Sequence, residues 1–330
     1  MSKLAITIAS WNYDRVQPII DGRVQVEGCD INYICLRPEE TFHRAYLNNE
    51  FEVSEIGFSA YMIACSRGNA NYVALPVFLS RLFRHSAIYI RTDRGIAKPA
   101  DLKGKLIGVP EYQMTAAMWA RGMLQDVYGV RPQDMRWRQG GLESPGRKDK
   151  FAMNLPVGFP LTAAGPDETL SVMLAQGKLD AIISAEAPSC HGDGKSPVAR
   201  LFEDFETAER EYFRATGLFP IMHALGIRAD VHAKHPWLAA SLYKAFGEAK
   251  KLATQDLEEV VALKLTLPWV ASHARATREL MGHDFWPYGV EPNRKALEAM
   301  TRYSYEQGLS VRKLSIEEMF ASGTLTQTII

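Results

Sequence analysis

The chain has 330 residues, of which 47% are hydrophobic and 23% charged, and its 38 basic side chains balance its 38 acidic ones. This is the composition of a globular protein with one or two domains, and it excludes a disordered tail, a collagen-like fibre and a disulfide-stapled miniprotein. The zero net charge also argues against a general nucleic-acid binder, which usually carries an excess of cations.

Two series of alternating strands and helices follow one another along the chain. In the first, the pattern predicts strands over 4–10, 29–36, 51–57, 72–78 and 86–91, and helices over 39–47 and 59–66. In the second, it predicts strands over 106–110, 135–138, 178–185 and 219–227, and helices over 114–128, 167–176, 206–215, 236–265 and 293–307. Such alternation is typical of a parallel or mixed sheet covered on both faces.

The segment 140–166 interrupts the second series. It is rich in Gly, Pro and Ser, and we interpret it as a long loop. A loop of this length in a compact protein is usually functional or mobile, so that both a lid and a subunit contact fit it. A homo-oligomer is compatible with the second alternative.

Neither the amino terminus nor the cysteines point to export. The apolar stretch near the start is too short for a signal peptide, and no run approaches the roughly 18 residues that span a bilayer. The four cysteines, Cys29, Cys35, Cys65 and Cys190, form no CxxC pair and no zinc-type spacing. We interpret them as buried small hydrophobic residues, and we expect a cytoplasmic protein with neither a membrane nor a nucleic acid as partner.

Positive charge is concentrated in the middle of the chain. Residues 81–150 contain 14 Lys and Arg against 7 Asp and Glu. Most of these cations are expected on solvated faces, but Arg81, Arg84 and His85 stand together between two β-rich runs. Two guanidiniums beside an imidazole form an anion clamp, because arginine binds a carboxylate through two parallel hydrogen bonds.

Other candidate site residues follow predicted strands. Near the start of the helix at 114–128, backbone N–H groups and the Thr115 hydroxyl can hold an anion, although Thr115 also fits a simple helix cap. Glu111 is an acid or base candidate that could equally pair with an arginine. Trp11 ends the first strand, where open α/β sheets place ligands, and could stack on a flat ring or pack in the core.

Two histidines are weaker candidates. His191 and Asp193 lie in a polar loop at a spacing that is a poor metal signal, and His223 lies in an apolar run typical of a core histidine. No phosphate-binding loop, GxGxxG, GxSxG or HExxH motif is present.

Several runs carry a resemblance to known families. The segments 101–109 and 178–182 resemble the type 2 periplasmic-binding-protein fold. More specific runs resemble the 4,5-dihydroxyphthalate decarboxylase family, namely 13–15, 21–23, 80–85, 108–113, 119–122 and 219–223. The resemblance spans most of the chain and weakens after about residue 236.

The resemblance implies a two-lobed α/β fold with the ligand in the cleft. Lobe 1 would comprise 1–90 and 226–330, lobe 2 would comprise 91–225, and the chain would cross between them near 88–93 and 224–228. The implied activity is the cofactor-independent conversion of 4,5-dihydroxyphthalate to 3,4-dihydroxybenzoate and CO2 by ring protonation. The alternatives are a non-catalytic receptor for an aromatic or pyrimidine-like anion, and another lyase or synthase on the same fold.

For that reaction we assign provisional roles to the candidate residues. Arg81 and Arg84, with Gln113 and Thr115, would hold the carboxylates of a small aromatic dicarboxylate. Proton shuttles would come from His85, His191 or His223, and Glu111 or Asp14 would orient an imidazole or accept a phenolic proton. Trp11 and Tyr13 would wall the ring. We assign no metal ligand and no cofactor, and leave a divalent metal chelated by the substrate open.

Overall fold

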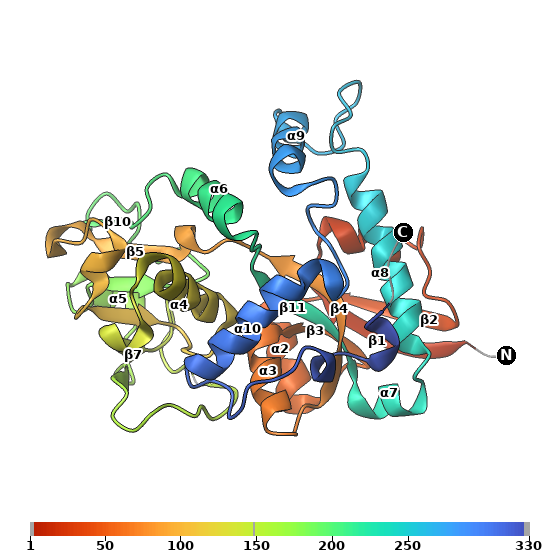
Figure 1. Cartoon of the computed structure of the whole chain (residues 1–330), viewed down its shortest axis with the longest axis horizontal. Helices are drawn as coiled ribbons and strands as arrows, with labels where there is room; N and C mark the ends of the chain where they lie inside the picture. Colours follow the sequence, from red (N-terminus) through yellow and green to blue (C-terminus); the bar gives the residue numbers. More distant parts are fainter. Residues whose placement is uncertain (1–2, 148, 327–330) are drawn as a thin grey trace.

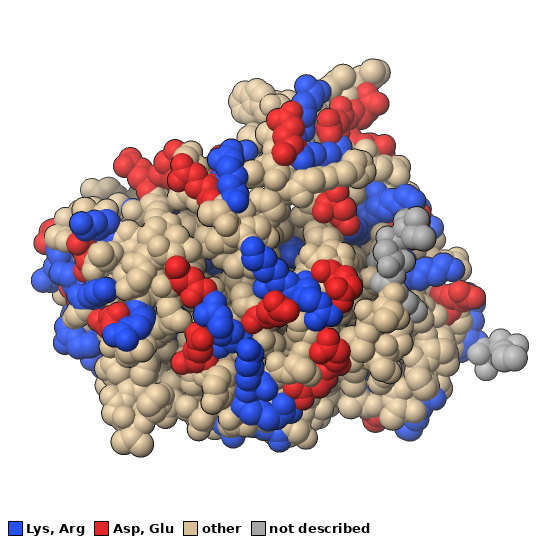
Figure 2. Space-filling model, viewed as in Figure 1, with Lys and Arg blue, Asp and Glu red and all other residues tan. Residues whose placement is uncertain are grey.

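The chain folds around two β-sheets, which divide the molecule into two halves. The structure, a computed structural model, describes residues 3–147 and 149–326. Figure 1 shows the two ends of the chain gathered on one side and the middle of the chain on the other. Figure 2 shows basic and acidic side chains interspersed over the face in view, in keeping with the balanced composition.

The first sheet has five strands in the order β2-β1-β3-β11-β4. Its strands are β1 (Leu4–Ser10), β2 (Cys29–Cys35), β3 (Val53–Gly57), β4 (Tyr72–Arg81) and β11 (Ile221–Arg228). Strands β2, β1 and β3 pair in parallel, whereas β11 runs antiparallel to both β3 and β4. All five residues of the central strand β3 are buried, as expected for a sheet covered on both faces.

The second sheet has six strands in the order β10-β5-β9-β6-β7-β8. Its strands are β5 (Ile88–Arg91), β6 (Leu106–Val109), β7 (Arg136–Gln139), β8 (Leu161–Ala163), β9 (Ala181–Ile183) and β10 (Val198–Arg200). Strands β9, β6, β7 and β8 are parallel, so their carboxyl ends lie at one edge of the sheet.

Helices cover both sheets and connect them. They are α1 (Gln17–Ile20), α2 (Pro38–Asn48), α3 (Phe58–Ser66), α4 (Thr115–Tyr128), α5 (Leu170–Ala175), α6 (Phe205–Thr216), α7 (Ala229–Lys234), α8 (Leu238–Thr254), α9 (Val270–Met281) and α10 (Arg294–Glu306). Within the described residues, no helix is both long enough and apolar enough to cross a membrane.

The sheets place the chain crossings at 82–87 and 201–220. The predicted boundaries at 90/91 and 225/226 fall inside β5 and β11, and each of these strands pairs entirely within one sheet. The division into two lobes at those residues stays a prediction.

Most predicted elements are present, and the differences have local causes. Strands β8 and β10 were missed because three residues are too few to show an alternating pattern. The helix predicted over 236–265 ends at Thr254, whose carbonyl accepts a hydrogen bond from Arg278 Nη2 at 2.8 Å, and a separate helix, α9, follows. Of the cysteines, Cys29 and Cys190 are buried, but Cys35 is exposed and Cys65 is partly exposed.

Helix α10 connects the two halves of the molecule. It lies against α3, which follows the first sheet, and against α4, which follows β6 of the second. Gly122 of α4 permits the close approach, because a Cβ at this position would overlap the ring of Tyr303. Trp119 of α4 also donates from Nε1 to the carbonyl of Ile221 in β11 at 2.8 Å. These contacts fix the second sheet relative to the first.

Candidate active site

A cavity of about 530 Å³ lies between the two sheets. The first sheet and its helices contribute Trp11, Arg37, Pro38, Glu39, Phe42, Tyr46, Gly57, Ala60, Met222 and His223. The 82–87 crossing and the second half contribute Arg84, Pro110, Glu111, Gln113, Met114, Thr115, Ala116, Leu142, Arg147, Lys150, Ser184, Ala185 and Glu186. The cavity is therefore shared by both halves and is large enough for a substituted aromatic ring.

Two helices begin at the cavity wall. Helix α3 begins at Phe58 directly after β3, and α4 begins at Thr115 shortly after β6. The Thr115 hydroxyl accepts the N–H of Ser59 at 3.1 Å, so that Thr115 caps the opposite helix and joins the two amino termini. The free N–H groups and helix dipoles at this point favour an anion.

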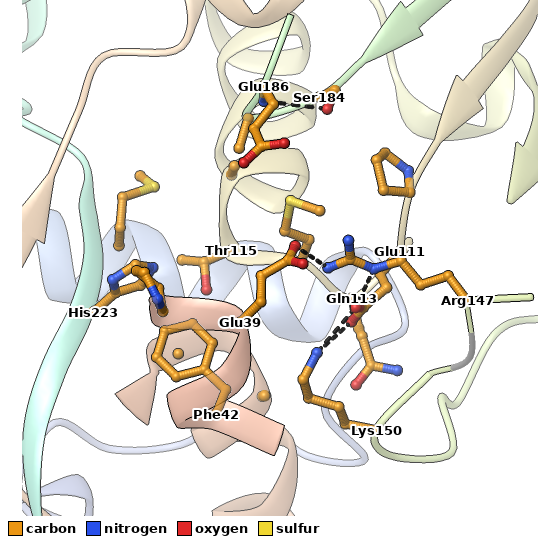
Figure 3. A pocket seen from close by; sticks show the side chains of 18 of the residues that line it. Glu39, Phe42, Glu111, Gln113, Thr115, Arg147, Lys150, Ser184, Glu186 and His223 are labelled. Atoms are coloured by element: carbon orange, nitrogen blue, oxygen red, sulfur yellow. Dashed lines mark hydrogen bonds and ion pairs between the residues drawn. The ribbon is translucent and has the colours of Figure 1, made fainter. Parts of the chain in front are cut away.

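A buried carboxylate holds His223 at the cavity wall. Nδ1 of His223 lies 2.6 Å from Oε1 of Glu55, which also accepts the hydroxyl of Tyr13 at 2.7 Å. The second oxygen of Glu55 accepts the N–H of Trp11 at 3.0 Å. The ring of His223 packs edge-on against Phe42, with centroids 4.7 Å apart (Figure 3). Nε2 of His223 has no hydrogen-bond partner among the described residues.

The electrostatics of this group keep Glu55 ionised. Burial by itself would raise the pKa of Glu55, but the hydrogen bond and charge of His223, with the donors from Trp11 and Tyr13, lower it below its usual range. Burial, followed by the Glu55 charge, raises the pKa of Tyr13 and keeps its hydroxyl protonated. Glu55 therefore fixes the tautomer of His223 and stabilises the positive charge that the ring acquires on protonation.

Arg84 brings a buried cation to the cavity. Arg84 is 7% exposed, and its Nε contacts the sulfur of Met222 at 3.2 Å. Burial lowers the pKa of Arg84 to about 10, while the charge of Glu209 acts in the opposite direction, so the side chain stays protonated near neutrality. No carboxylate of the described chain forms an ion pair with it. A carboxylate in the cavity would supply that missing partner.

The loop 140–166 is attached to the cavity through Glu111. Arg147 lies 2.6 Å from one Glu111 oxygen, and Lys150 contacts both oxygens at 2.9 Å. Arg147 also pairs with Glu39 of α2 at 2.6 Å and thereby joins the two sides of the cleft (Figure 3). Glu111 is thus held in ion pairs, one of the two alternatives that the sequence left open.

Gln113 holds the same loop. Its side-chain amide donates to the carbonyl of Phe151 at 3.0 Å and accepts the Phe151 N–H at 3.2 Å. Phe151 in turn packs edge-on against Tyr46 of α2, with centroids 5.4 Å apart. The loop therefore covers the cavity and contacts both halves of the molecule.

The remaining sequence candidates lie outside the cavity lining. Arg81 binds the carbonyls of Phe219 and Pro287 and the side chain of Asn293, and so holds the end of β4 to the segment that precedes α10. Asp14 pairs with its neighbour Arg15 at 3.0 Å.

His85 and His191 are likewise absent from the lining. His85 is fully buried among aromatic rings, the nearest being Phe202 and Tyr212 at 4.9 and 5.3 Å between centroids, and burial lowers its pKa to about 4. His191 packs edge-on against Tyr89 in the second half. Of the three histidine candidates, only His223 reaches the cavity.

Several cavity residues were not anticipated from the sequence. They are Arg37, Arg147, Lys150 and Glu186. Glu55, which lies behind the lining and holds His223, was not anticipated either. Glu55 carried one available signal, since a carboxylate inside the apolar run of β3 must find a partner when it is buried. Among the described residues, no group of three or more His, Cys, Asp or Glu side chains is arranged to hold a metal ion.

Comparison with solved structures defines the class of fold. The periplasmic aliphatic sulphonate binding protein of Escherichia coli superposes with a TM-score of 0.54 at 14% identity, over 99% of this chain and 100% of that one. The alkanesulfonate-binding protein of Xanthomonas axonopodis pv. citri gives 0.50 at 11% identity, over 97% and 98%. The chain has the fold of the periplasmic binding proteins, with its cavity at the cleft between the sheets.

Sequence relatives then define the family. No protein-family model matches the chain. A 4,5-dihydroxyphthalate decarboxylase of Comamonas testosteroni is 44% identical over 325 residues, 98% of each chain. One of Pseudomonas putida is 45% identical over 215 residues, 65% of this chain and 83% of that one. The chain belongs to the 4,5-dihydroxyphthalate decarboxylase family and is an enzyme of the carboxy-lyase class rather than a receptor.

Proposed function

We propose that this chain removes one carboxylate from 4,5-dihydroxyphthalate and releases 3,4-dihydroxybenzoate and CO2, with His223 as the acid that protonates the ring. The family supports the substrate. The single observation that carries the mechanism is an imidazole, held by the buried carboxylate of Glu55, in the same cavity as the unpaired guanidinium of Arg84.

The substrate can supply its own electrons for this reaction. Each of its carboxylate-bearing carbons is para to a hydroxyl, and electron density from that oxygen makes the carbon basic. The protonated imidazole of His223 transfers its Nε2 proton to this carbon. The carbon–carboxylate bond then breaks, and its electron pair returns the ring to aromaticity. The net change is one proton gained by the ring and one CO2 lost, after which the imidazole is protonated again from solvent.

The two carboxylates need separate partners. Arg84 provides the two NH2 groups of its guanidinium for one of them, and its burial strengthens the interaction because little water competes. The amino termini of α3 and α4, joined at Thr115, favour negative charge beside it. Binding both anionic groups through fixed donors orients the departing carboxylate without reorganisation at the moment of reaction.

The rest of the wall suits a flat ring. Phe42 and Trp11 present aromatic surface, and the sulfur of Met222 is a favourable neighbour for an aromatic face. The loop that Arg147 and Phe151 attach covers the cavity and keeps bulk water away from the reacting carbon, so that its proton comes from the imidazolium. We further propose that the reaction needs no cofactor, because the ring itself supplies the electron pair that binds the proton and regains a pair when the carbon–carboxylate bond breaks.

The test is product formation by the purified, chelator-treated protein. Incubation with 4,5-dihydroxyphthalate should give equimolar 3,4-dihydroxybenzoate by chromatography and CO2 by trapping. The variant His223→Asn should lose about 10²- to 10⁴-fold in kcat, the usual contribution of a positioned general acid. His273→Asn, the same substitution on the exposed face of α9, is the matched control and should retain wild-type activity.

Two results would contradict the proposal. Absence of the dihydroxybenzoate product with the untreated enzyme would refute the assigned substrate, and full activity in His223→Asn would refute the assignment of His223 as the acid. Activity that disappears on chelation and returns with a divalent metal would replace the cofactor-free mechanism by a metal-assisted one.

A further inference from the structure

The charges that line the cavity do not all pair with one another. Among the described lining residues there are four cations and three carboxylates. Arg147 and Lys150 are neutralised by Glu39 and Glu111 through the ion pairs of the loop. What remains is the cationic pair Arg37 and Arg84, together with one further carboxylate, Glu186.

Glu186 is held at the cavity by the end of a strand. It follows β9 by three residues, at the edge where the parallel strands of the second sheet end. Its N–H donates to the hydroxyl of the buried Ser184 at 3.3 Å, which fixes the turn, while its side chain is exposed. Figure 3 shows the carboxylate of Glu186 directed into the space that separates it from His223 and Phe42.

A free carboxylate is at first sight unsuited to a cavity for a dianion. Like charges at close range repel, and the cavity already contains the cations that a dicarboxylate needs. A carboxylate can only accept hydrogen bonds, and it is favourable in a partly desolvated site when donors are placed against it. The described residues provide no side-chain donor to Glu186, so water hydrates its exposed carboxylate in the free enzyme, and a ligand that displaces this water has to supply donors in its place.

We propose that Glu186 recognises the two adjacent hydroxyls of the aromatic substrate and thereby determines both its orientation and its selection. This inference rests on the proposed function, because it takes the substrate to be anionic at one end and to carry hydroxyl donors at the other. The two oxygens of Glu186 accept one hydroxyl each, while the carboxylates are repelled towards Arg84 and the amino termini of α3 and α4. The free anion and the free cations of the cavity thus match the two ends of one molecule.

The same contact assists the reaction. A hydroxyl that donates to a carboxylate has more electron density on its oxygen, and this density is delivered through the ring to the para carbon, which is the carbon that His223 protonates. The contribution of Glu186 is therefore expected in kcat as well as in binding. A residue that served only the fold would change neither the preference for hydroxyls nor the ratio of the two kinetic constants.

The proposal is tested by comparing ligands with and without hydroxyls. Calorimetry on the full chain, in a His223→Asn background so that no ligand is consumed, gives the Kd of 4,5-dihydroxyphthalate and of phthalate. Adding Glu186→Gln should lower the preference for the dihydroxy ligand about ten- to hundredfold, the effect of a charged hydrogen bond. Phthalate should bind the variant as well as before or more tightly, since a like charge is gone.

Glu203→Gln is the matched control, being another exposed glutamate of the second half that lies outside the cavity lining. It should leave both Kd values unchanged. An undiminished preference for hydroxyls in Glu186→Gln would overturn the role of Glu186 while leaving the proposed function in place. Absence of product from the wild-type enzyme is a separate result that would overturn the proposed function, and the binding comparison does not depend on it.

Discussion

Replacing Glu55 with glutamine is the sharpest test of how the site is built. Glu55 accepts His223 and Tyr13 on one oxygen and the N–H of Trp11 on the other, so all three of its partners are donors. The glutamine amide has the same shape but offers only one acceptor oxygen. Whichever way it is placed, its NH2 group faces at least one donor, and the negative charge beside the imidazole is lost.

The magnitude follows from that geometry. Loss of one charge-assisted hydrogen bond to the imidazolium is worth about 1.5–3 kcal/mol, and this stabilisation is needed in the protonated state that transfers the proton. Since each 1.36 kcal/mol is a factor of ten in rate, Glu55→Gln should lower kcat about ten- to hundredfold. KM should change little, because Glu55 lies behind His223 and does not touch the substrate.

Steady-state kinetics of CO2 release measure both constants. Glu52→Gln is the matched control, because Glu52 also accepts a backbone N–H, from Thr7 at 3.0 Å, yet lies outside the cavity lining. It reveals any general effect of neutralising a carboxylate next to β3. A kcat of Glu55→Gln within twofold of the wild type, or a loss that falls on KM instead of kcat, would refute the assignment of Glu55 as the residue that positions the acid.

Two further predictions concern stability. Burial lowers the pKa of His85 from 6.5 to about 4. Between these two pH values the unfolded chain binds a proton that the folded chain does not. The free energy of unfolding should therefore fall as pH falls through this window, by at most about 3 kcal/mol. Denaturant titrations should show this slope in the wild type and a flatter one in His85→Phe, and equal slopes would contradict a buried neutral imidazole. Gly122→Ala should destabilise the fold by about 1–3 kcal/mol because the added methyl overlaps Tyr303, whereas Gly323→Ala, where a Cβ meets no neighbour, should not. A wild-type midpoint for Gly122→Ala would show that α4 and α10 pack less closely than described.

Local patterns were sufficient for most of the fold. The strand at 4–10 was placed at its observed bounds, and Gly129, with a φ of 65°, ends α4 as predicted, because alternation and helix stops are written in neighbouring residues. Three-residue strands such as β8 leave no such pattern. They form because a neighbouring strand, here β7, offers a partner that the sequence around 161–163 does not reveal.

The site was only partly within reach of the sequence. Arg81 and Arg84 are equivalent by residue type and nearly adjacent, but the strand ends between them, so that one guanidinium binds carbonyls near α10 and the other enters the cavity. The partnership of Glu55 with His223 joins residues 168 positions apart across an antiparallel pair of strands. No local signal encodes that register, which is set by the packing of the whole sheet.

The contact between α10 and α4 has a consequence for how the enzyme operates. Tyr303 and Trp119 hold α4 against α10 and β11, and these contacts oppose a rotation of the second sheet away from the first. Substrate entry and product release would then depend on the loop that Arg147 and Phe151 attach, which is held by a few ion pairs and one contact between rings. The two walls that carry His223 and Arg84 keep their spacing from one turnover to the next.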